Sequence, residues 1–458
     1  MAVGSVVTLG CLMAGAAVFS VGGAPTVVTV TRHLKREPPV VNLCGPFPPR
    51  HATALDVTAT GRRLWSTALE TRGQNPDADV PPLVAGDTAY VAESGVVHAL
   101  ATSDGRSMWS WAGGRTVYGM WVWRGLIAVL TDQVSDHARL TGLDRRTGAV
   151  RWQLAVPGGG LIGDPVATAD GGLGWLRSDG ALQVVDLGTG SVRWTVARNR
   201  QALPVASDGL VLAADDGSLT AFDDETGQNR WTVSGLPPEQ VDRVVPGLVV
   251  VTSGVVGPSS PTALTALDPV TGRLVWRFDP GTAVTVLSAG PAGLAVATYV
   301  PDRRLYLLDL QNGDVRWEAE TAITLDTFPI VLAGDIVSVE GGVEGYPGSN
   351  LVDRATDDGG LRWKVRVPGT PTGPQPVLRS GSLVAVEASG STGDSSLFAY
   401  DLDDGHEAWR AVMPEFIDEA PVAFSGGFLV LASTPVSGCA TSRTPRRAPG
   451  AGVPLHDA

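Results

Sequence analysis

Short apolar runs separated by turn residues extend along most of the chain, from about residue 52 to residue 435. In residues 201–233, for example, the runs are short, rich in Val, Leu and Ala, and end at Gly or Asp. Runs of this length between turn residues are typical of β-strands. Because no repeat interval shows the apolar spacing of a full amphipathic helix, the pattern predicts an all-β protein.

A tryptophan motif recurs through the same region. Nine segments place Trp four residues after a Gly, as in ETGQNRW and VTGRLVW, and successive tryptophans are 37 to 46 residues apart. An interval of this length accommodates about four antiparallel strands, which is the size of a propeller blade. The nine motif tryptophans are Trp65, Trp109, Trp152, Trp194, Trp231, Trp276, Trp317, Trp363 and Trp409.

The motif has a mechanical interpretation. The Gly lies in a hairpin turn that needs a positive φ, and the Trp lies on the following strand, where its ring can wedge between blades. Six copies also carry an Asp four residues before the Gly, which we expect to accept turn N–H groups rather than to bind a metal. These residues are Asp144, Asp186, Asp223, Asp268, Asp309 and Asp401.

The D-x-x-T-G-x-x-x-W pattern resembles the tryptophan-docking repeat of the PQQ-like β-propellers, the superfamily of the quinoprotein alcohol dehydrogenases. The resemblance implies a propeller of four-stranded antiparallel blades, commonly eight, whereas the motif count allows nine. The chain enters with ATALDVTATG and RRLWSTAL and leaves with EAPVAFSGG and FLVLAS. We therefore expect the N-terminal and C-terminal strands to share one closing blade.

The chain divides into four predicted regions. Residues 1–31 carry no charged side chain and are long enough to cross a bilayer, so we expect a transmembrane anchor or a signal segment. A linker (32–51), the propeller (52–439) and a disordered tail (440–458) follow.

Two observations on cellular compartment point in opposite directions. Arg32, Lys35 and Arg36 follow the apolar segment directly, which favours a cytoplasmic propeller. Cys44 and Cys439 lie at the two ends of the repeat region, where a disulfide would staple the closing blade in an oxidising compartment. We give the second more weight and expect a propeller on the extracytoplasmic side of the cell membrane, or a secreted one; two unpaired thiols are the alternative.

Composition excludes one class of partner. The formal net charge is −13 and the sequence pI is about 4.9, whereas a surface that follows nucleic acid phosphates is basic. We expect no nucleic acid partner, and a monomer that binds a protein or a small ligand.

No catalytic, cofactor or metal residues are predicted. The resemblance implies that quinoprotein dehydrogenases need a disulfide between adjacent cysteines and a calcium site, and this chain has neither adjacent cysteines nor a match for the calcium set. The six histidines are scattered without zinc spacing. Among the tryptophans outside the motif, Trp121, Trp123 and Trp175 have two interpretations, an aromatic binding patch and core filling between blades.

These observations favour a non-catalytic, membrane-anchored propeller that acts as a scaffold or sensor. The resemblance supports this role, because similar propellers include an outer-membrane assembly lipoprotein and kinase sensor domains. A divergent PQQ-dependent dehydrogenase is the alternative, and a purely structural surface propeller is a third possibility.

Overall fold

The computed structural model divides the chain into two units, Met1–Pro46 and Phe47–Ala458, and all described residues belong to the second unit. The structure describes residues 51–433 apart from 57–61, 70–79, 133–137, 157–160, 198–203, 208, 216, 236–240, 246, 254–261, 299–302, 324–328, 342–348, 372–376, 381–382, 390–394, 414–421 and 426–427.

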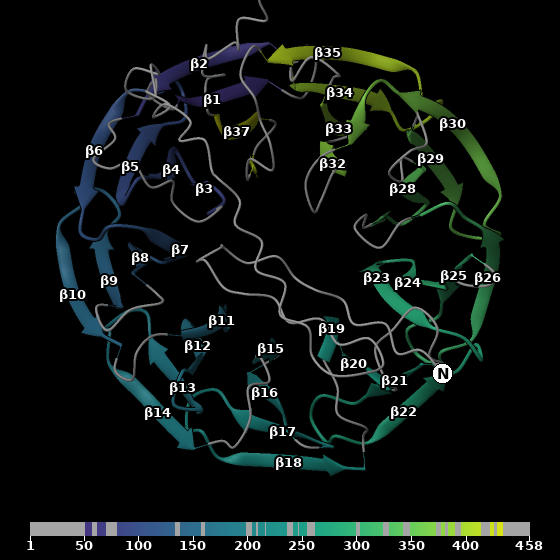
Figure 1. Ribbon diagram of the computed structural model, residues 1–458, viewed down its shortest axis with the longest axis horizontal. Coiled ribbons are helices and arrows are strands. Elements are labelled where there is room, and N and C mark those ends of the chain that lie inside the picture. Colours follow the sequence, from purple (N-terminus) through teal and green to yellow (C-terminus); the bar gives the residue numbers. More distant parts are fainter. Residues whose placement is uncertain are drawn as a thin grey trace, which may run out of the picture. The chain divides into compact units, whose positions relative to one another are not determined.

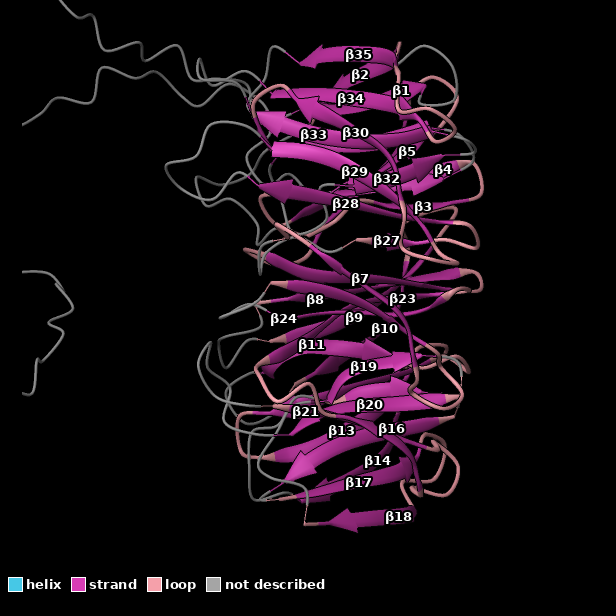
Figure 2. Cartoon of the chain, turned by 90° about the vertical axis from the view of Figure 1, so that its right-hand side faces the viewer, coloured by secondary structure: helices cyan, strands magenta, loops and turns pink. Residues whose placement is uncertain are grey.

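The described residues of the second unit form nine antiparallel sheets that follow one another around a ring (Figure 1). The strands of a sheet follow one another from the middle of the ring to its rim, as from β7 to β10 and from β15 to β18. The side view shows strands and turns and no helix in this part of the chain (Figure 2). No helix long and apolar enough to cross a membrane occurs among the described residues.

The strand bounds follow, from the middle of the ring to the rim. The first four sheets are β36 (Val422–Ser425), β37 (Phe428–Ser433), β1 (His51–Asp56) and β2 (Arg63–Ala68); β3 (Leu83–Ala85), β4 (Thr88–Glu93), β5 (Val96–Ala101) and β6 (Ser107–Ala112); β7 (Val117–Trp123), β8 (Leu126–Thr131), β9 (Arg139–Asp144) and β10 (Val150–Ala155); and β11 (Leu161–Ala167), β12 (Gly172–Arg177), β13 (Ala181–Asp186) and β14 (Val192–Ala197). The next three are β15 (Val205–Ser207), β16 (Leu210–Asp215), β17 (Ser218–Asp223) and β18 (Asn229–Ser234); β19 (Val241–Val245), β20 (Leu248–Ser253), β21 (Ala263–Leu267) and β22 (Leu274–Phe278); and β23 (Val284–Gly290), β24 (Gly293–Thr298), β25 (Arg304–Leu308) and β26 (Val315–Glu320). The last two are β27 (Ile330–Val331), β28 (Asp335–Gly341), β29 (Ser349–Ala355) and β30 (Leu361–Val367); and β31 (Thr370–Pro371) and β32 (Val377–Ser380), both paired with β33 (Leu383–Ser389), then β34 (Ser395–Asp401) and β35 (Glu407–Met413).

The two ends of the repeat region share one sheet. Strand β1 pairs with β37 in antiparallel register from His51 opposite Ser433 to Asp56 opposite Phe428. The predicted closing blade is thereby confirmed, with two C-terminal strands inside and two N-terminal strands at the rim. The described sheets number nine, the number that the motif count allows.

Burial follows the position of a strand within its sheet. The middle strands are buried on both faces, as in β4 and β24, because a neighbouring sheet covers each face. The rim strands instead alternate, with a buried Trp between exposed neighbours, as in β2 and β26. Each rim strand therefore contributes one large ring to the contact with the next sheet.

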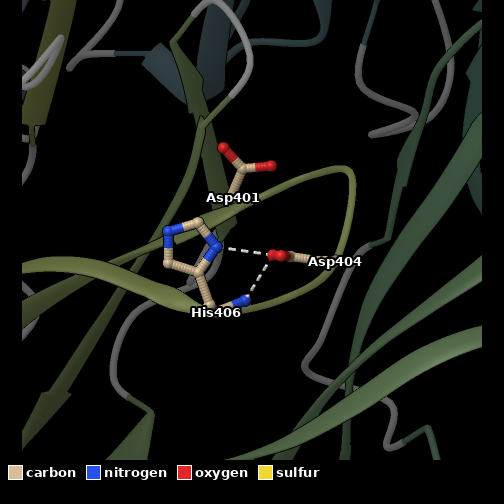
Figure 3. Close-up of side chains that lie close together, drawn as sticks. All are labelled: Asp401, Asp404 and His406. Carbon is tan, nitrogen blue, oxygen red and sulfur yellow. Dashed lines mark hydrogen bonds and ion pairs between the residues drawn. The ribbon is translucent and has the colours of Figure 1, made fainter.

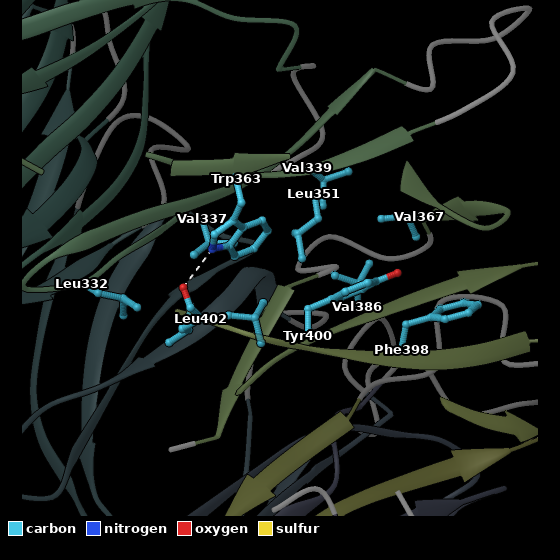
Figure 4. Close-up of a cluster of buried hydrophobic side chains, with 11 residues drawn as sticks. Leu332, Val337, Val339, Leu351, Trp363, Val367, Val386, Phe398, Tyr400 and Leu402 are labelled. Atoms are coloured by element: carbon cyan, nitrogen blue, oxygen red, sulfur yellow. Dashed lines mark hydrogen bonds between the residues drawn. The ribbon is translucent and has the colours of Figure 1, made fainter. Parts of the chain in front are cut away.

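That contact includes a hydrogen bond from the indole to the next sheet. Trp231 Nε1 donates to the carbonyl oxygen of Pro269 at 2.8 Å, and Trp363 Nε1 donates to that of Leu402 at 2.8 Å (Figure 4). In each case the acceptor comes directly after the first residue of the next motif turn. Five further indoles, those of Trp65, Trp109, Trp194, Trp276 and Trp317, make the equivalent bond.

The face of the same indole lies on the glycine of the next motif. Gly272 has a φ of +67°, and a Cβ built there would lie 2.7 Å from the ring of Trp231. Eight of the nine motif glycines are described, and all eight meet the preceding tryptophan in this way. The glycine is therefore required twice, by the backbone conformation of its own turn and by the ring of the sheet before it.

Two of the junctions depart from this pattern. Among the described residues, the buried Nε1 atoms of Trp152 and Trp409 have no hydrogen-bond partner. The ring of Trp152 still packs on Gly190, where a built Cβ would lie 2.4 Å away. Packing and hydrogen bonding are therefore separable parts of the junction.

Apolar side chains fill the space between consecutive sheets. In one such cluster, Trp363 of the β27–β30 sheet packs with Val337 and Leu351 of its own sheet and with Tyr400 and Leu402 of the next (Figure 4). Burial of such large side chains stabilises a fold by roughly 1.5–3 kcal/mol each. The core is thus divided into layers, one at each junction.

We expect Gly272→Ala to destabilise the protein more than Gly247→Ala does. Both glycines have positive φ, +67° and +80°, so both substitutions incur the left-handed cost of about 1–2 kcal/mol. Only Gly272 faces a ring, whereas nothing lies within 4 Å of a Cβ at Gly247. Displacing the Trp231 ring should add about 1–3 kcal/mol to the loss of unfolding free energy, which a lower urea midpoint measures. Equal midpoints for the two variants would contradict the proposed packing role.

We also expect Trp231→Phe to cost more than Trp152→Phe. The first substitution leaves the buried Pro269 carbonyl without its donor, whereas the second removes a buried N–H that has no acceptor. The difference in unfolding free energy should be about 1–3 kcal/mol, measured by denaturant titration of the two variants side by side.

Candidate functional site

The motif aspartates shape the turns between the third and fourth strands. Asp268 Oδ1 accepts the backbone N–H of Thr271 at 2.7 Å and its hydroxyl at 2.8 Å. Asp144, Asp186 and Asp223 accept the same two groups from their own threonines, while Asp309 and Asp401 accept a backbone N–H two residues later. The expectation that these carboxylates accept turn N–H groups is confirmed.

Four of these aspartates also pair with an arginine that directly precedes the motif tryptophan. Arg151 lies 2.6 Å from Asp144, and Arg316 lies 2.5 Å from Asp309. Arg193 and Arg230 pair with Asp186 and Asp223 in the same way. The hydrogen bonds from Arg151 and Thr147 lower the pKa of Asp144 to about 2, so these carboxylates are ionised at neutral pH.

One turn brings three potential metal ligands together (Figure 3). Oxygen and nitrogen atoms of Asp401, Asp404 and His406 lie within 4.8 Å of one another. Asp404 Oδ1, however, already lies 2.5 Å from His406 Nδ1 and accepts the His406 backbone N–H at 3.0 Å. Side chains of His406 and Asp404 are 62% and 65% exposed, so ordinary turn hydrogen bonds account for this cluster, and we assign no metal to it.

A buried acid spans the junction between the β11–β14 and β15–β18 sheets. Asp224 is 4% exposed, and burial, followed by the charge of Asp170 in the preceding sheet, raises its pKa to about 6. Arg193 bonds to both Asp170 and Asp186 and so neutralises part of this charge. The cluster is a hydrogen-bonded contact between two sheets.

A second buried acid lies on β29. Asp353 is completely buried, and in the described part of the chain neither of its carboxylate oxygens has a hydrogen-bond partner. Burial, and then the charge of Asp335, raises its pKa to about 7. Asp353 pairs across the sheet with Trp363, a place where the other eight sheets carry Ala, Gly, Val or Leu.

Neither buried acid was predicted from the sequence. A signal for Asp353 was present, because it stands ten residues before its motif tryptophan, where all eight other copies carry an apolar residue or Gly. Asp224 directly follows the motif residue Asp223 and has no distinguishing pattern of its own.

The predicted aromatic residues lie mainly in the core. Trp175 is completely buried and packs with Leu140 and Leu173, so it cannot line an exposed patch. Trp121 and Trp123 are half-buried and pack against the same cluster. Cys44, Cys439 and the apolar segment 1–31 lie outside the described residues, so the disulfide, the membrane segment and the compartment stay predictions.

Comparison with known proteins identifies the family. The sequence profile described as outer membrane protein assembly factor BamB matches residues 50–195, 111–234, 136–279, 178–339 and 301–441. Because these matches together span most of the chain, the protein is a PQQ-like repeat propeller and belongs to that family. Searching the curated protein sequences finds no match.

Solved structures show the same fold at low sequence identity. BamB from Moraxella catarrhalis is 18% identical with a TM-score of 0.44, covering 80% of this chain and 98% of its own. The dihydro-heme d1 dehydrogenase NirN in complex with DHE is 14% identical with a TM-score of 0.50, covering 75% and 76%. Quinohemoprotein alcohol dehydrogenase from Comamonas testosteroni is 14% identical with a TM-score of 0.41, covering 88% and 78%. The NirN match, with the highest TM-score of the three, shows the fold alone.

The quinone chemistry implied by the dehydrogenase resemblance does not fit this chain. Its three cysteines are Cys11, Cys44 and Cys439, so the adjacent pair is missing. Within the described ranges, the one group of residues suited to a metal is the exposed turn at Asp401. We derive no catalytic step through a quinone or a metal.

We expect Asp353 to make stability fall as pH rises. Its pKa is near 7 when folded and about 4 when unfolded, so between these values folding takes up one proton. Stability should decrease by at most about 1.4 kcal/mol per pH unit from pH 4 to pH 7 and then level off.

Asp353→Asn should remove the pH dependence of stability and raise the melting temperature at pH 8. Asp353→Leu should have the same effects, since Leu307 occupies the equivalent position in the β23–β26 sheet. Asp223→Asn is the control of opposite sign. The pKa of Asp223 is lowered to about 2, so this substitution should weaken the protein at pH 7 and lose its effect below about pH 2. Unchanged melting curves for Asp353→Asn across this range would contradict the assignment.

Proposed function

We propose that this propeller is a non-catalytic, extracytoplasmic scaffold that binds a partner protein at the cell membrane. The observation that carries the proposal is the family match across residues 50–441, whose description is that of an assembly factor. The interactions of the polar residues support the proposal. Turn hydrogen bonds and ion pairs involve the motif aspartates and the group of Asp401, Asp404 and His406. A ring of sheets suits the presentation of a binding surface.

Anchoring and compartment rest on the ends of the chain. The uncharged segment 1–31 supports membrane attachment, and the positions of Cys44 and Cys439 on either side of the repeat region support an oxidising compartment. In intact host cells, both thiols should resist a maleimide until reductant is added. Labelling without reductant would contradict the disulfide.

The scaffold role is tested by photo-crosslinking in the native host. Benzoyl-phenylalanine introduced at the exposed rim residues Leu274, Val315 and Leu361 should give a discrete adduct from some positions and none from others. In parallel, the purified chain should not reduce dye with alcohols after addition of PQQ and Ca²⁺. Measurable turnover would overturn the proposal in favour of a dehydrogenase.

A further inference from the structure

The β19–β22 sheet departs from the repeat at its rim. In four other sheets the residue before the motif tryptophan is an arginine that pairs with the turn aspartate. In β22 this residue is Val275, and the hydrogen bonds of the Asp268 carboxylate among the described residues come from its own turn, chiefly from Thr271. The second carboxylate oxygen of Asp268 is therefore left without the arginine that the repeat supplies elsewhere.

The same sheet exposes more apolar surface than the others. Val270 is 74% exposed, Leu274 is 63% exposed and Val275 is 42% exposed. No other described sheet, with its rim turn, exposes more than one large apolar residue; these single residues are Leu64, Met108, Val150, Val192, Val315 and Leu361. A local concentration of this kind is typical of an interaction site, whereas single exposed residues are ordinary.

The backbone of β22 is also open to pairing. The strand pairs with β21 from Leu274 opposite Leu267 to Phe278 opposite Leu264, and no described strand pairs with its outer edge. An edge strand offers a row of N–H and C=O groups to an extended segment. Charged side chains on an edge oppose such pairing. At Val275 the charge found at Arg151, Arg230 and Arg316 is missing, while the exposed Arg277 of the same strand pairs with Asp279 at 3.5 Å.

We propose that Val270, Leu274, Val275 and Asp268 form the docking surface for an extended, arginine-bearing segment of the partner protein. The segment pairs with the outer edge of β22, covers Leu274 and Val275 with an apolar side chain, and brings its arginine to Asp268. Charge complementarity selects this occupant, because Asp268 is ionised and lacks the arginine that the equivalent aspartates pair with. The hydrogen bond from Thr271 lowers the pKa of Asp268. The inference rests on the proposed function and locates its binding surface.

The test uses the full chain and a fluorescent peptide of alternating Val and Thr, with one central Arg and a Lys at each end. We expect saturable binding by anisotropy at low ionic strength, and at least tenfold weaker binding to Val275→Arg. This substitution restores the repeat pattern, so its own ion pair with Asp268 should keep the protein folded. Val150→Arg is the matched control, because Val150 is 48% exposed beside an intact Arg151–Asp144 pair.

A second peptide, with Gln in place of Arg, separates the charge from the strand pairing. The Gln peptide should bind the wild-type chain at least fivefold more weakly than the Arg peptide does. It should bind the Asp268→Asn chain with the same low affinity. Hydrogen exchange should show slower exchange of outward-facing β22 amides when the arginine peptide is bound, with no change in β10. Binding that survives Val275→Arg, or that is equal for both peptides, would overturn the inference.

Other outcomes are distinguishable. Sedimentation could show a dimer of the wild-type chain that is lost in the Val275→Arg variant. The occupant of the surface would then be a second copy of this chain, and the inference would be overturned. Crosslinking from Val315 or Leu361 but not from Leu274, with no peptide binding, would overturn the inference and leave the scaffold function standing. Turnover with PQQ would defeat the scaffold function itself.

Discussion

The contact between an indole ring and the glycine turn of the next sheet is the interaction on which the fold depends. One turn residue must adopt a positive φ, lack a Cβ, and be preceded by a carbonyl that the indole N–H can reach. These demands fall on two segments about 40 residues apart, because the tryptophan ends one repeat and the glycine ends the following one. A regular spacing in the sequence therefore corresponds to a regular contact in space, and each sheet needs a neighbour to bury its faces.

This correspondence explains how far the sequence could predict the fold. Short apolar runs and the spacing of the tryptophans were sufficient for four-stranded sheets and for the shared sheet of β1 and β37. The number of sheets was a different matter, since each junction is a contact between neighbours only and no local motif encodes how many junctions complete the ring. Counting the motifs gave nine, whereas the family resemblance alone favoured eight.

The candidate sites were harder to predict, because their chemistry comes from burial. Trp175 has the residue type of a binding-site aromatic, yet it lies within the core between two sheets. Asp353 shows the reverse, an acid at a place that the other sheets keep apolar or small, where burial in the junction, followed by the charge of Asp335, raises its pKa. Asp224 depends on Asp170, which belongs to another sheet and is 54 residues away in sequence. No local pattern brings such a pair together.

In a ring of similar sheets, positions that depart from the repeat carry the most information about function. The junction glycines and tryptophans recur because every sheet needs them, so they cannot distinguish one face of the ring from another. Asp353 departs from the repeat inside the core, where its effect is on stability and its pH dependence. The loss of an arginine at Val275 departs from it at the rim, where it removes an ion pair and exposes apolar surface. Because this change removes an ion pair from its own sheet, we propose that it serves binding.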